Sequence, residues 1–471
     1  MLATVTDFLW SYVLVAVLVA IGLAFTFGSR FVQLRYFGEM FRVLGQAFQH
    51  HSGHVSSFQA LTLSVAGRVG AGNIAGVAVA ITLGGPGAVF WMWVVGLIGM
   101  ATSFFECSLA QLFKTRDKRT TTFRGGPMYY MERGLGSRKI GIAFTLLLLF
   151  TFGLAFVALQ SFTASSSLEE AFGIPVHVTG IALTIVIGLT IFGGVQRISR
   201  VTEIVVPIMA IGYILIALAV MLYNIAAVPA ALMIILKSAF GLEQAVGGGI
   251  GAAIMMGVRR GLFSNEAGLG SAPNVAAVAY VPHPVNQGIV QSFSVFIDTA
   301  IICTATAFII IMAGMHEVGT IDNGVVLTQL ALKEHVGDWG ETFVSVTLML
   351  FAFSSILYNF YLGENASYWM NPDNPWFFII FRLLMLVLIL WGSMQDLTTV
   401  FSFADLTMAL LALFNLVALG FLMKLGFRLM RDYDDQWRAG RVPVFDPARF
   451  SDVNIDPDAW SDAADAVVEK D

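Results

Sequence analysis

Two glycine-rich stretches of the chain carry polar and charged side chains inside otherwise apolar segments. The first, 64–73, contains Arg68 and Asn73, and the second, 257–273, contains Glu266. Charged side chains at membrane depth are costly, so they mark functional sites by default. Non-helical backbone is tolerated there only where it is buried in protein or lines a cavity. We therefore expect each stretch to interrupt a membrane helix and to present backbone and side-chain groups to a ligand.

Other interpretations of these residues fit less well. Glycine can simply allow two helices to pack closely, but close packing does not explain the buried charges. The spacing at 70–75 matches a dinucleotide-binding glycine motif, which requires a strand and a helix around it rather than a membrane segment. Ser271 would need His283 as its base in a protease, and we expect His283 at the cytoplasmic end, near Pro282 and Pro284, and not on a facing helix. The histidines at 50, 51 and 54 fit a solvated loop better than a metal site. The residues therefore predict no enzyme and no nucleic-acid partner.

The composition requires that these stretches lie in a helical membrane protein. Apolar residues make up 57% of the 471, charged residues only 12%, and the mean hydropathy is +0.79. A soluble domain carries about 25% charged residues, and about 20 apolar residues are needed to cross a bilayer. We predict an all-α polytopic fold with eleven transmembrane helices. The expected spans lie near 8–28, 58–82, 87–113, 140–166, 177–195, 201–223, 243–281 (interrupted), 289–313, 342–362, 376–394 and 398–423.

The basic residues predict how these spans are oriented. Most of the 26 lysines and arginines fall in loops on one side, and only Lys237 and Lys333 fall in the opposite loops. Because cytoplasmic loops carry the excess of basic residues, we expect an outer amino terminus and a cytoplasmic carboxyl terminus in the inner membrane. Residues 1–430 then form one membrane domain, and 431–471 form a solvated cytoplasmic tail. The lipid bilayer is the only partner besides a small ligand, and we expect no obligate protein partner.

The two interrupted spans head two halves of five spans each, at about 58–223 and 243–423, after one additional amino-terminal span. With the predicted orientation, the first broken span runs outward and the second runs inward, so the halves form an inverted repeat. Broken helices at corresponding positions of inverted repeats are typical of secondary transporters. A channel is the alternative, but a channel needs a continuous polar stripe rather than polar groups gathered at two breaks.

Several sequence strings resemble the alanine/glycine:cation symporter family. They are AGRVGAGNIAG (66–76), GGPGAVFWMW (84–93), SNEAGLGSAP (264–273), FIDT (296–299) with CTATAF (303–308), and FSSIL (353–357) followed by Gly363 and Glu364. The resemblance covers about residues 8–425. It implies a leucine-transporter-like fold with one extra amino-terminal span, and alternating-access import of a small neutral amino acid coupled to sodium.

The resemblance also implies which residues bind the amino acid. Unwound backbone supplies amides for the substrate carboxylate, and helix amino termini add positive potential. The expected substrate residues are Ala71, Gly72 and Asn73 at the first break, Phe263 and Ser264 opposite them, and Gln160 in the fourth span. Taken alone, Gln160 is equally well explained as a glutamine that bridges two helices.

By the same resemblance, the sodium ligands are the carbonyls of Ala66, Val69 and Phe351 and the hydroxyls of Ser354 and Ser355. Sodium is a hard cation that binds oxygen, and broken helices free carbonyl oxygens for it. Without the resemblance, a serine pair in a membrane helix is more often bonded to its own helix. Only the resemblance selects sodium over protons, so a proton-coupled transporter of the same fold remains an alternative.

The buried charges need partners. We predict that Arg68 pairs with a carboxylate of the seventh span or with Glu106, and that these residues, with Arg259 and Glu266, tie the broken segments together or gate them. Asp298 and Asp405 fit either an ion or proton site or satisfied structural acids.

Two positions depart from the family pattern. The family usually has threonine at the position of Ala71 and tryptophan at the position of Asn359. A carboxamide in place of an indole enlarges the pocket and adds hydrogen-bonding capacity. We therefore expect a larger or more polar neutral amino acid, such as glutamine, to be preferred over alanine or glycine.

Overall fold

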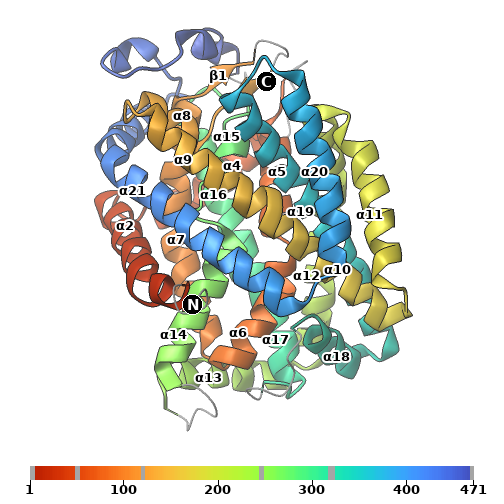
Figure 1. The fold of residues 1–471 in the computed structure, drawn as a ribbon. Helices are drawn as coiled ribbons and strands as arrows, with labels where there is room; N and C mark the ends of the chain where they lie inside the picture. The colour runs from red at the N-terminus through yellow and green to blue at the C-terminus, as the bar shows by residue number, and fades with distance from the viewer. Residues whose placement is uncertain (1–5, 48–53, 118–121, 243–248, 317–323, 467–471) are drawn as a thin grey trace.

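The computed structural model describes residues 6–47, 54–117, 122–242, 249–316 and 324–466, and these are almost entirely helical. The amino-terminal segment begins with one helical span, Thr6–Gly28, which has a π-helical turn near its start. Its elements are η1 (Leu9–Leu14), α2 (Val15–Gly28), α3 (Val32–Arg35) and α4 (Phe37–Ala47). Figure 1 shows α2 lying along α21 (Leu397–Arg438), and α2 also packs against α7 (Ala88–Leu112). The extra amino-terminal span is therefore part of the bundle.

The first half of the bundle begins with a broken helix. Its remaining elements include a two-stranded hairpin and a short helix at the end of the molecule where Figure 1 places β1 and α8. The elements in order are α5 (Ser57–Arg68), η2 (Gly72–Gly76), α6 (Val77–Gly84), α7, β1 (Thr115–Arg116), β2 (Phe123–Arg124), α8 (Pro127–Arg133), α9 (Arg138–Leu148), η3 (Leu149–Phe156), α10 (Val157–Phe172), α11 (Val176–Ile191), α12 (Gly194–Tyr223), η4 (Ile225–Ala227) and α13 (Val228–Ala239).

The second half repeats this design with its own broken helix. Figure 1 places both α13 and α18 at the end of the bundle opposite to β1. The elements are α14 (Gly249–Asn265), α15 (Ala272–Ala276), α16 (Pro284–Val295), η5 (Phe296–Cys303), α17 (Thr304–Met312), α18 (Gly324–Val336), α19 (Asp338–Met370), α20 (Pro375–Ser393) and α21. The halves interlock, because α14 and α16 pack on α7 while α19 packs on α10 and α5.

Polar residues fix where the helices begin. Ser56 forms a capping box with Gln59 at the start of α5, so both exchange side-chain and backbone hydrogen bonds there. Asn374 and Asp396 cap α20 and α21 by accepting from the backbone two or three residues on. The apolar runs between such caps set the lengths of the spans.

The predicted number of spans is not confirmed. Among the described residues, eight helices are long and apolar enough to cross a membrane, or nine if the bent pair α5–α6 counts as one span. The expected spans near 177–195 and 243–281 correspond to α11, which has 16 residues, and to α14, which has 17 and ends in a break. Both helices are shorter than the roughly 20 residues of a typical span. Their exact ends could not be predicted from the sequence, so the sequence did not show that they are short.

The described part of the tail packs on the membrane domain instead of extending into solvent. The helix α21 continues to Arg438, eight residues beyond the predicted boundary, and Phe445 and Trp460 are buried. Trp460 covers the ammonium group of Lys114, whose other side lies over the ring of Phe123. Burial of the ammonium group lowers the pKa of Lys114 to about 7.

Candidate functional site

The first break lies where the sequence predicts it. The helix α5 ends at Arg68, Val69 is extended, and the chain resumes as η2 at Gly72 with a bend of 49° between the two parts. The Gly70 amide donates to the side-chain oxygen of Asn73 at 2.9 Å, and the Asn73 amide donates back to the Gly70 carbonyl at 3.2 Å. These local bonds satisfy backbone groups that the helix has released.

The second break is shorter than the sequence predicts. The helix α14 continues without interruption to Asn265, and the unwound backbone covers 266–271, with Glu266 at a φ of 53°. The preceding glycines serve close packing: a Cβ at Gly257 would lie 2.5 Å from the Ala88 carbonyl oxygen on α7. The stretch 257–273 is therefore unwound only from Glu266 onward, because glycine at 257 brings two helices together.

A buried polar cluster joins the two broken helices. The Asn73 side-chain amide donates to the Asp298 carboxylate at 2.5 Å and to the Ser264 hydroxyl at 3.0 Å. The hydroxyls of Ser264 and Thr299 each donate to the other Asp298 oxygen at 2.8 Å. Asn73 follows the first break, Ser264 lies in the last turn of α14, and Asp298 lies in the π-helical segment η5. All four residues are buried, so this carboxylate is satisfied by neutral donors from three elements.

Gln160 reaches the backbone of the first break. Its side-chain oxygen accepts from the Ala71 amide at 3.2 Å, and a Cβ on Gly70 would lie 2.9 Å from its side-chain nitrogen. Gly72 is equally close to the other broken helix, since a Cβ there would lie 3.1 Å from both Phe263 and Ser264. The structure therefore brings together the predicted residues at the first break with those from α10 and α14.

Four of the five predicted sodium ligands form two hydrogen-bonded pairs, each of a serine hydroxyl and a backbone carbonyl. The Ser355 hydroxyl donates across helices to the Ala66 carbonyl at 2.8 Å, and the Ser354 hydroxyl donates to the Phe351 carbonyl at 3.0 Å within α19. Val69, the fifth, is the extended residue directly after α5. All five are buried.

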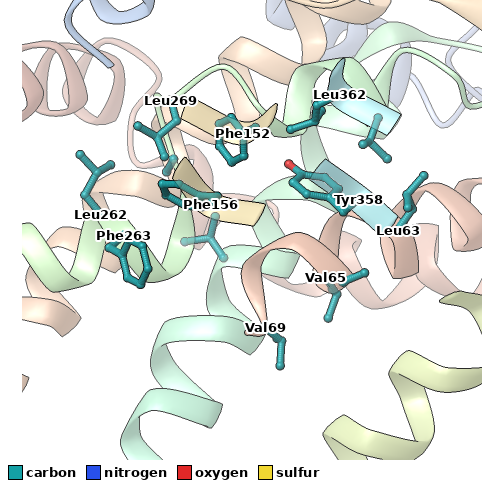
Figure 2. Packing of buried hydrophobic residues seen from close by; sticks show 14 of the residues in the cluster. Leu63, Val65, Val69, Phe152, Phe156, Leu262, Phe263, Leu269, Tyr358 and Leu362 are labelled. Carbon is teal, nitrogen blue, oxygen red and sulfur yellow. The ribbon is translucent and has the colours of Figure 1, made fainter. Parts of the chain in front are cut away.

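Aromatic side chains close the space between the breaks. Figure 2 shows apolar residues of α5, η3, α14 and α19 packed together there, with Phe156 beside Phe263 and Phe152 beside Tyr358. Tyr358 fills the gap left by Gly67, where a Cβ would lie 2.2 Å from its ring. Asn359 follows on α19, one turn beyond Ser355, and is 1% exposed, and its side-chain nitrogen has no partner among the described residues.

Among the residues that the structure describes, no carboxylate pairs with Arg68, so the predicted ion pair is wrong. Its guanidinium donates to the Gln291 carbonyl at 3.0 Å, to the Ser103 hydroxyl at 2.9 Å and to the Ser294 hydroxyl. Arg68 is 1% exposed, and its acceptors come from α7 and α16. Neutral acceptors thus satisfy most of the guanidinium, which fixes the end of α5 against these two helices.

Glu106 and Glu266 hold the second break instead. Glu106 on α7 accepts from the Gly268 amide at 3.1 Å and from Asn415 on α21 at 3.0 Å. Glu266 accepts from the hydroxyl of Ser271 at 2.6 Å and from that of Tyr358 at 3.1 Å. These bonds fix the unwound backbone between α14 and α15.

The remaining charges form an ion-pair network at the amino-terminal helix. Arg260 pairs with Asp405 on α21 at 2.7 Å, and Arg259 lies 3.2 Å from Asp7 and 3.8 Å from Asp405. The Trp10 indole donates to the Asp405 backbone carbonyl at 3.1 Å. Arg259 therefore ties α14 to the additional amino-terminal helix, not to the other broken helix.

Sequence reasoning missed the part played by Asn415 and Tyr358, because neither lies in a glycine-rich stretch. Their hydrogen bonds to the two acids come from helices far along the chain, and no spacing rule connects them. The described residues contain no group of three His, Cys, Asp or Glu side chains that could hold a metal ion. His50 and His51, considered above as metal ligands, lie outside the described residues.

A family model described as the sodium:alanine symporter family matches residues 1–447. The chain belongs to this family. It is 46% identical to the amino-acid carrier protein AlsT of Bacillus subtilis over 97% of this chain and 96% of that protein. It is 45% identical to the probable sodium/glutamine symporter GlnT of Bacillus subtilis, with 93% and 91% covered. The putative sodium/proton-dependent alanine carrier protein YrbD of the same organism is 39% identical, with 96% of each chain covered.

Solved structures share the fold at low sequence identity. The structure of MhsT in complex with L-phenylalanine has a TM-score of 0.54 and 12% identity, covering 88% of this chain and 96% of that chain. A manganese transporter of Eremococcus coleocola has a TM-score of 0.53 and 14% identity, covering 87% and 84%. The predicted leucine-transporter-like fold is confirmed, and this member of the sodium:alanine symporter family is a cation-coupled amino-acid transporter of the membrane, not an enzyme.

Proposed function

We propose that this family member imports a small neutral amino acid together with sodium by alternating access. The observation that carries the proposal is the cluster of Asn73, Ser264 and Asp298, because it links the two broken helices through a buried carboxylate. A rearrangement of either broken helix must break or remake these bonds. A ligand bound among them therefore influences both helices at once, which coupling between substrate and ion requires.

The first break offers donors for a substrate carboxylate. The Ala71 amide now donates to the Gln160 oxygen, and the Gln160 side-chain nitrogen lies next to Gly70. A carboxylate placed at Gly70–Gly72 can accept from the released amides and from that nitrogen. Charge-assisted hydrogen bonds of this kind are about twice as strong as neutral ones. The aromatic ring of Phe263 covers the opposite side.

The proposed sodium site uses the two hydroxyl–carbonyl pairs of α5 and α19. A cation placed between Ser355 and the Ala66 carbonyl would take both oxygens, and Ser354, Phe351 and Val69 would complete the shell. The donor set consists of neutral oxygens, which suits a hard monovalent cation better than a transition metal. The site also joins a broken helix to an unbroken one, so ion binding would favour one arrangement of the two.

Proton coupling is the second candidate, and Asp298 favours it. This buried carboxylate lies at the contact between both broken helices and has three neutral donors and no cation partner among the described residues. Protonation would remove a charge from the contact without any change in its shape. Relatives named as sodium/proton-dependent alanine carriers are consistent with either ion.

The side chain of Asn359 favours a substrate whose own side chain is polar. Among the described residues the buried Asn359 nitrogen has no hydrogen-bond partner, and an unpaired buried amide costs about 1–3 kcal/mol. A substrate with a side-chain oxygen would satisfy it, whereas the methyl group of alanine would not. The likeness to a probable sodium/glutamine symporter supports the same choice. We therefore propose glutamine ahead of alanine and glycine.

The basic loops support an inner-membrane protein with an outer amino terminus and a cytoplasmic carboxyl terminus. The test of the whole proposal is uptake of labelled glutamine and alanine into proteoliposomes that contain the purified protein. We expect saturable uptake that requires external sodium and is inhibited better by glutamine than by alanine. Uptake driven equally well by a proton gradient without sodium would favour the second candidate. Large, unsaturable flux without a gradient would indicate a channel.

A further inference from the structure

A basic cavity lies at the end of the amino-terminal membrane helix, far from the two breaks in sequence. It has a volume of about 450 Å³ between the end of α2 and the final turns of α21. Its charged lining consists of four arginines, Arg30, Arg35, Arg431 and Arg438, and two aspartates, Asp434 and Asp435. The lining therefore carries more positive than negative charge, and nothing in the amino-acid transport reaction uses it.

The arginines are not neutralised equally. Asp434 forms an ion pair with Arg35 at 3.1 Å and accepts a hydrogen bond from the Tyr36 hydroxyl. Arg30, Arg431 and Arg438 are exposed, and none has a carboxylate partner in the part of the chain that the structure describes. Three arginines thus face one remaining aspartate, which leaves the cavity open to an anion.

The backbone brings these arginines together through an unusual turn. Arg30 and Phe31 both have left-handed φ values, 56° and 58°, which side chains other than glycine rarely adopt. The turn is closed by the Phe31 amide, which donates to the Thr26 carbonyl at 2.7 Å. Gly28 lets the Phe427 ring approach, since a Cβ there would lie 2.4 Å from that ring. The chain reverses at the end of α2, so that Arg30 lies beside α21.

The surroundings of the cavity are those of a membrane surface. The apolar helical span Thr6–Gly28 ends at the cavity, and Phe27 and Phe31 are 61% and 43% exposed. Phe427 and Met430 provide an apolar wall inside the cavity. Basic pockets between membrane helices on the cytoplasmic side bind the head groups of anionic lipids. With the predicted orientation, this cavity faces that side.

We propose that this cavity binds the phosphate head group of an anionic phospholipid of the cytoplasmic leaflet, with acyl chains lying along the exposed apolar side of α2. Arginine suits this task because its planar group forms paired hydrogen bonds with phosphate oxygens. The bound lipid bridges α2 and α21 and thereby holds the additional amino-terminal helix on the bundle.

Lipid-dependent thermal unfolding of the delipidated full-length protein tests this proposal. Phosphatidylglycerol, phosphatidylcholine and inorganic phosphate are added separately, and native mass spectrometry counts the bound lipids. The site variant is Arg30→Gln with Arg431→Gln, which leaves the Arg35–Asp434 pair intact. The matched control is Lys139→Gln with Arg441→Gln, which removes two exposed charges outside the cavity.

We expect phosphatidylglycerol to raise the unfolding temperature of the wild type and of the control more than phosphatidylcholine does. The site variant should lose at least half of this difference and retain fewer phosphatidylglycerol molecules. An equal response of the site and control variants would overturn the proposal, and so would reproduction of the effect by inorganic phosphate. If the double variant does not fold, Arg431→Gln alone is compared with Arg441→Gln under the same criteria.

Discussion

Replacement of Ser355 by alanine tests the proposed sodium site at its central contact. The Ser355 hydroxyl bridges α19 to the Ala66 carbonyl at the end of α5, at 2.8 Å, and both residues are buried. The substitution removes one oxygen ligand and leaves a carbonyl without its donor. Such a loss costs about 1–3 kcal/mol, which corresponds to roughly a 5- to 150-fold change in an equilibrium constant. We expect the sodium concentration for half-maximal uptake to rise within that range.

The assay is the initial rate of labelled amino-acid uptake in proteoliposomes over a sodium series. Ser367→Ala is the matched control, because Ser367 is an equally buried serine on α19 that lies 12 residues from the proposed site. The control should leave sodium activation unchanged. The double variant Ser354→Ala with Ser355→Ala should shift it further, since both hydroxyls belong to the proposed shell. An unchanged activation curve for Ser355→Ala would refute the assignment of the cation to this site.

Three further predictions address substrate, coupling and tail. Asn359→Trp should shift inhibition of uptake from glutamine toward alanine and glycine, and an unchanged order of inhibitors would remove residue 359 from the pocket. Asp298→Asn keeps the shape of the carboxylate but takes away its charge, so uptake should fall roughly 5- to 150-fold, at a cost of about 1–3 kcal/mol. Near-normal uptake would leave Asp298 a structural residue. Burial under Trp460 lowers the pKa of Lys114 to about 7, whereas undocking of the tail would return this pKa toward its ordinary value of 10.5. Between these two pH values the protein with an undocked tail therefore binds more protons than the protein with a docked tail. Docking should therefore strengthen as pH rises through this window, seen as slower proteolysis of the tail, and a Lys114→Gln variant should lose this dependence.

The broken helices could be predicted because their cause is local. Glycine next to Arg68 and Asn73 in an apolar run is inconsistent with an ordinary membrane span, and the structure places the first break there. The point within 257–273 at which the second break begins could not be predicted, because Gly257 looks the same in sequence whether it unwinds a helix or packs it closely. Only the neighbouring Ala88 carbonyl distinguishes the two.

Contacts between distant helices could not be predicted. Asn73 and Asp298 are 225 residues apart, and which side of η5 faces the first break depends on the packing of the whole bundle. The partner of Arg68 was misjudged because a buried charge was assumed to need an opposite charge. Two serine hydroxyls and a backbone carbonyl instead accept hydrogen bonds from its two terminal nitrogens. The docked tail was missed for a similar reason, since the ring of Trp460 finds its partner on the loop after α7.

The most direct test of the central claim is accumulation of labelled glutamine in proteoliposomes against its own gradient, driven only by an inward sodium gradient. The account predicts saturable accumulation above the external concentration, which collapses when the sodium gradient is dissipated and is inhibited by other neutral amino acids. Equilibration of glutamine without accumulation, or accumulation that is unaffected by removal of sodium, would contradict it.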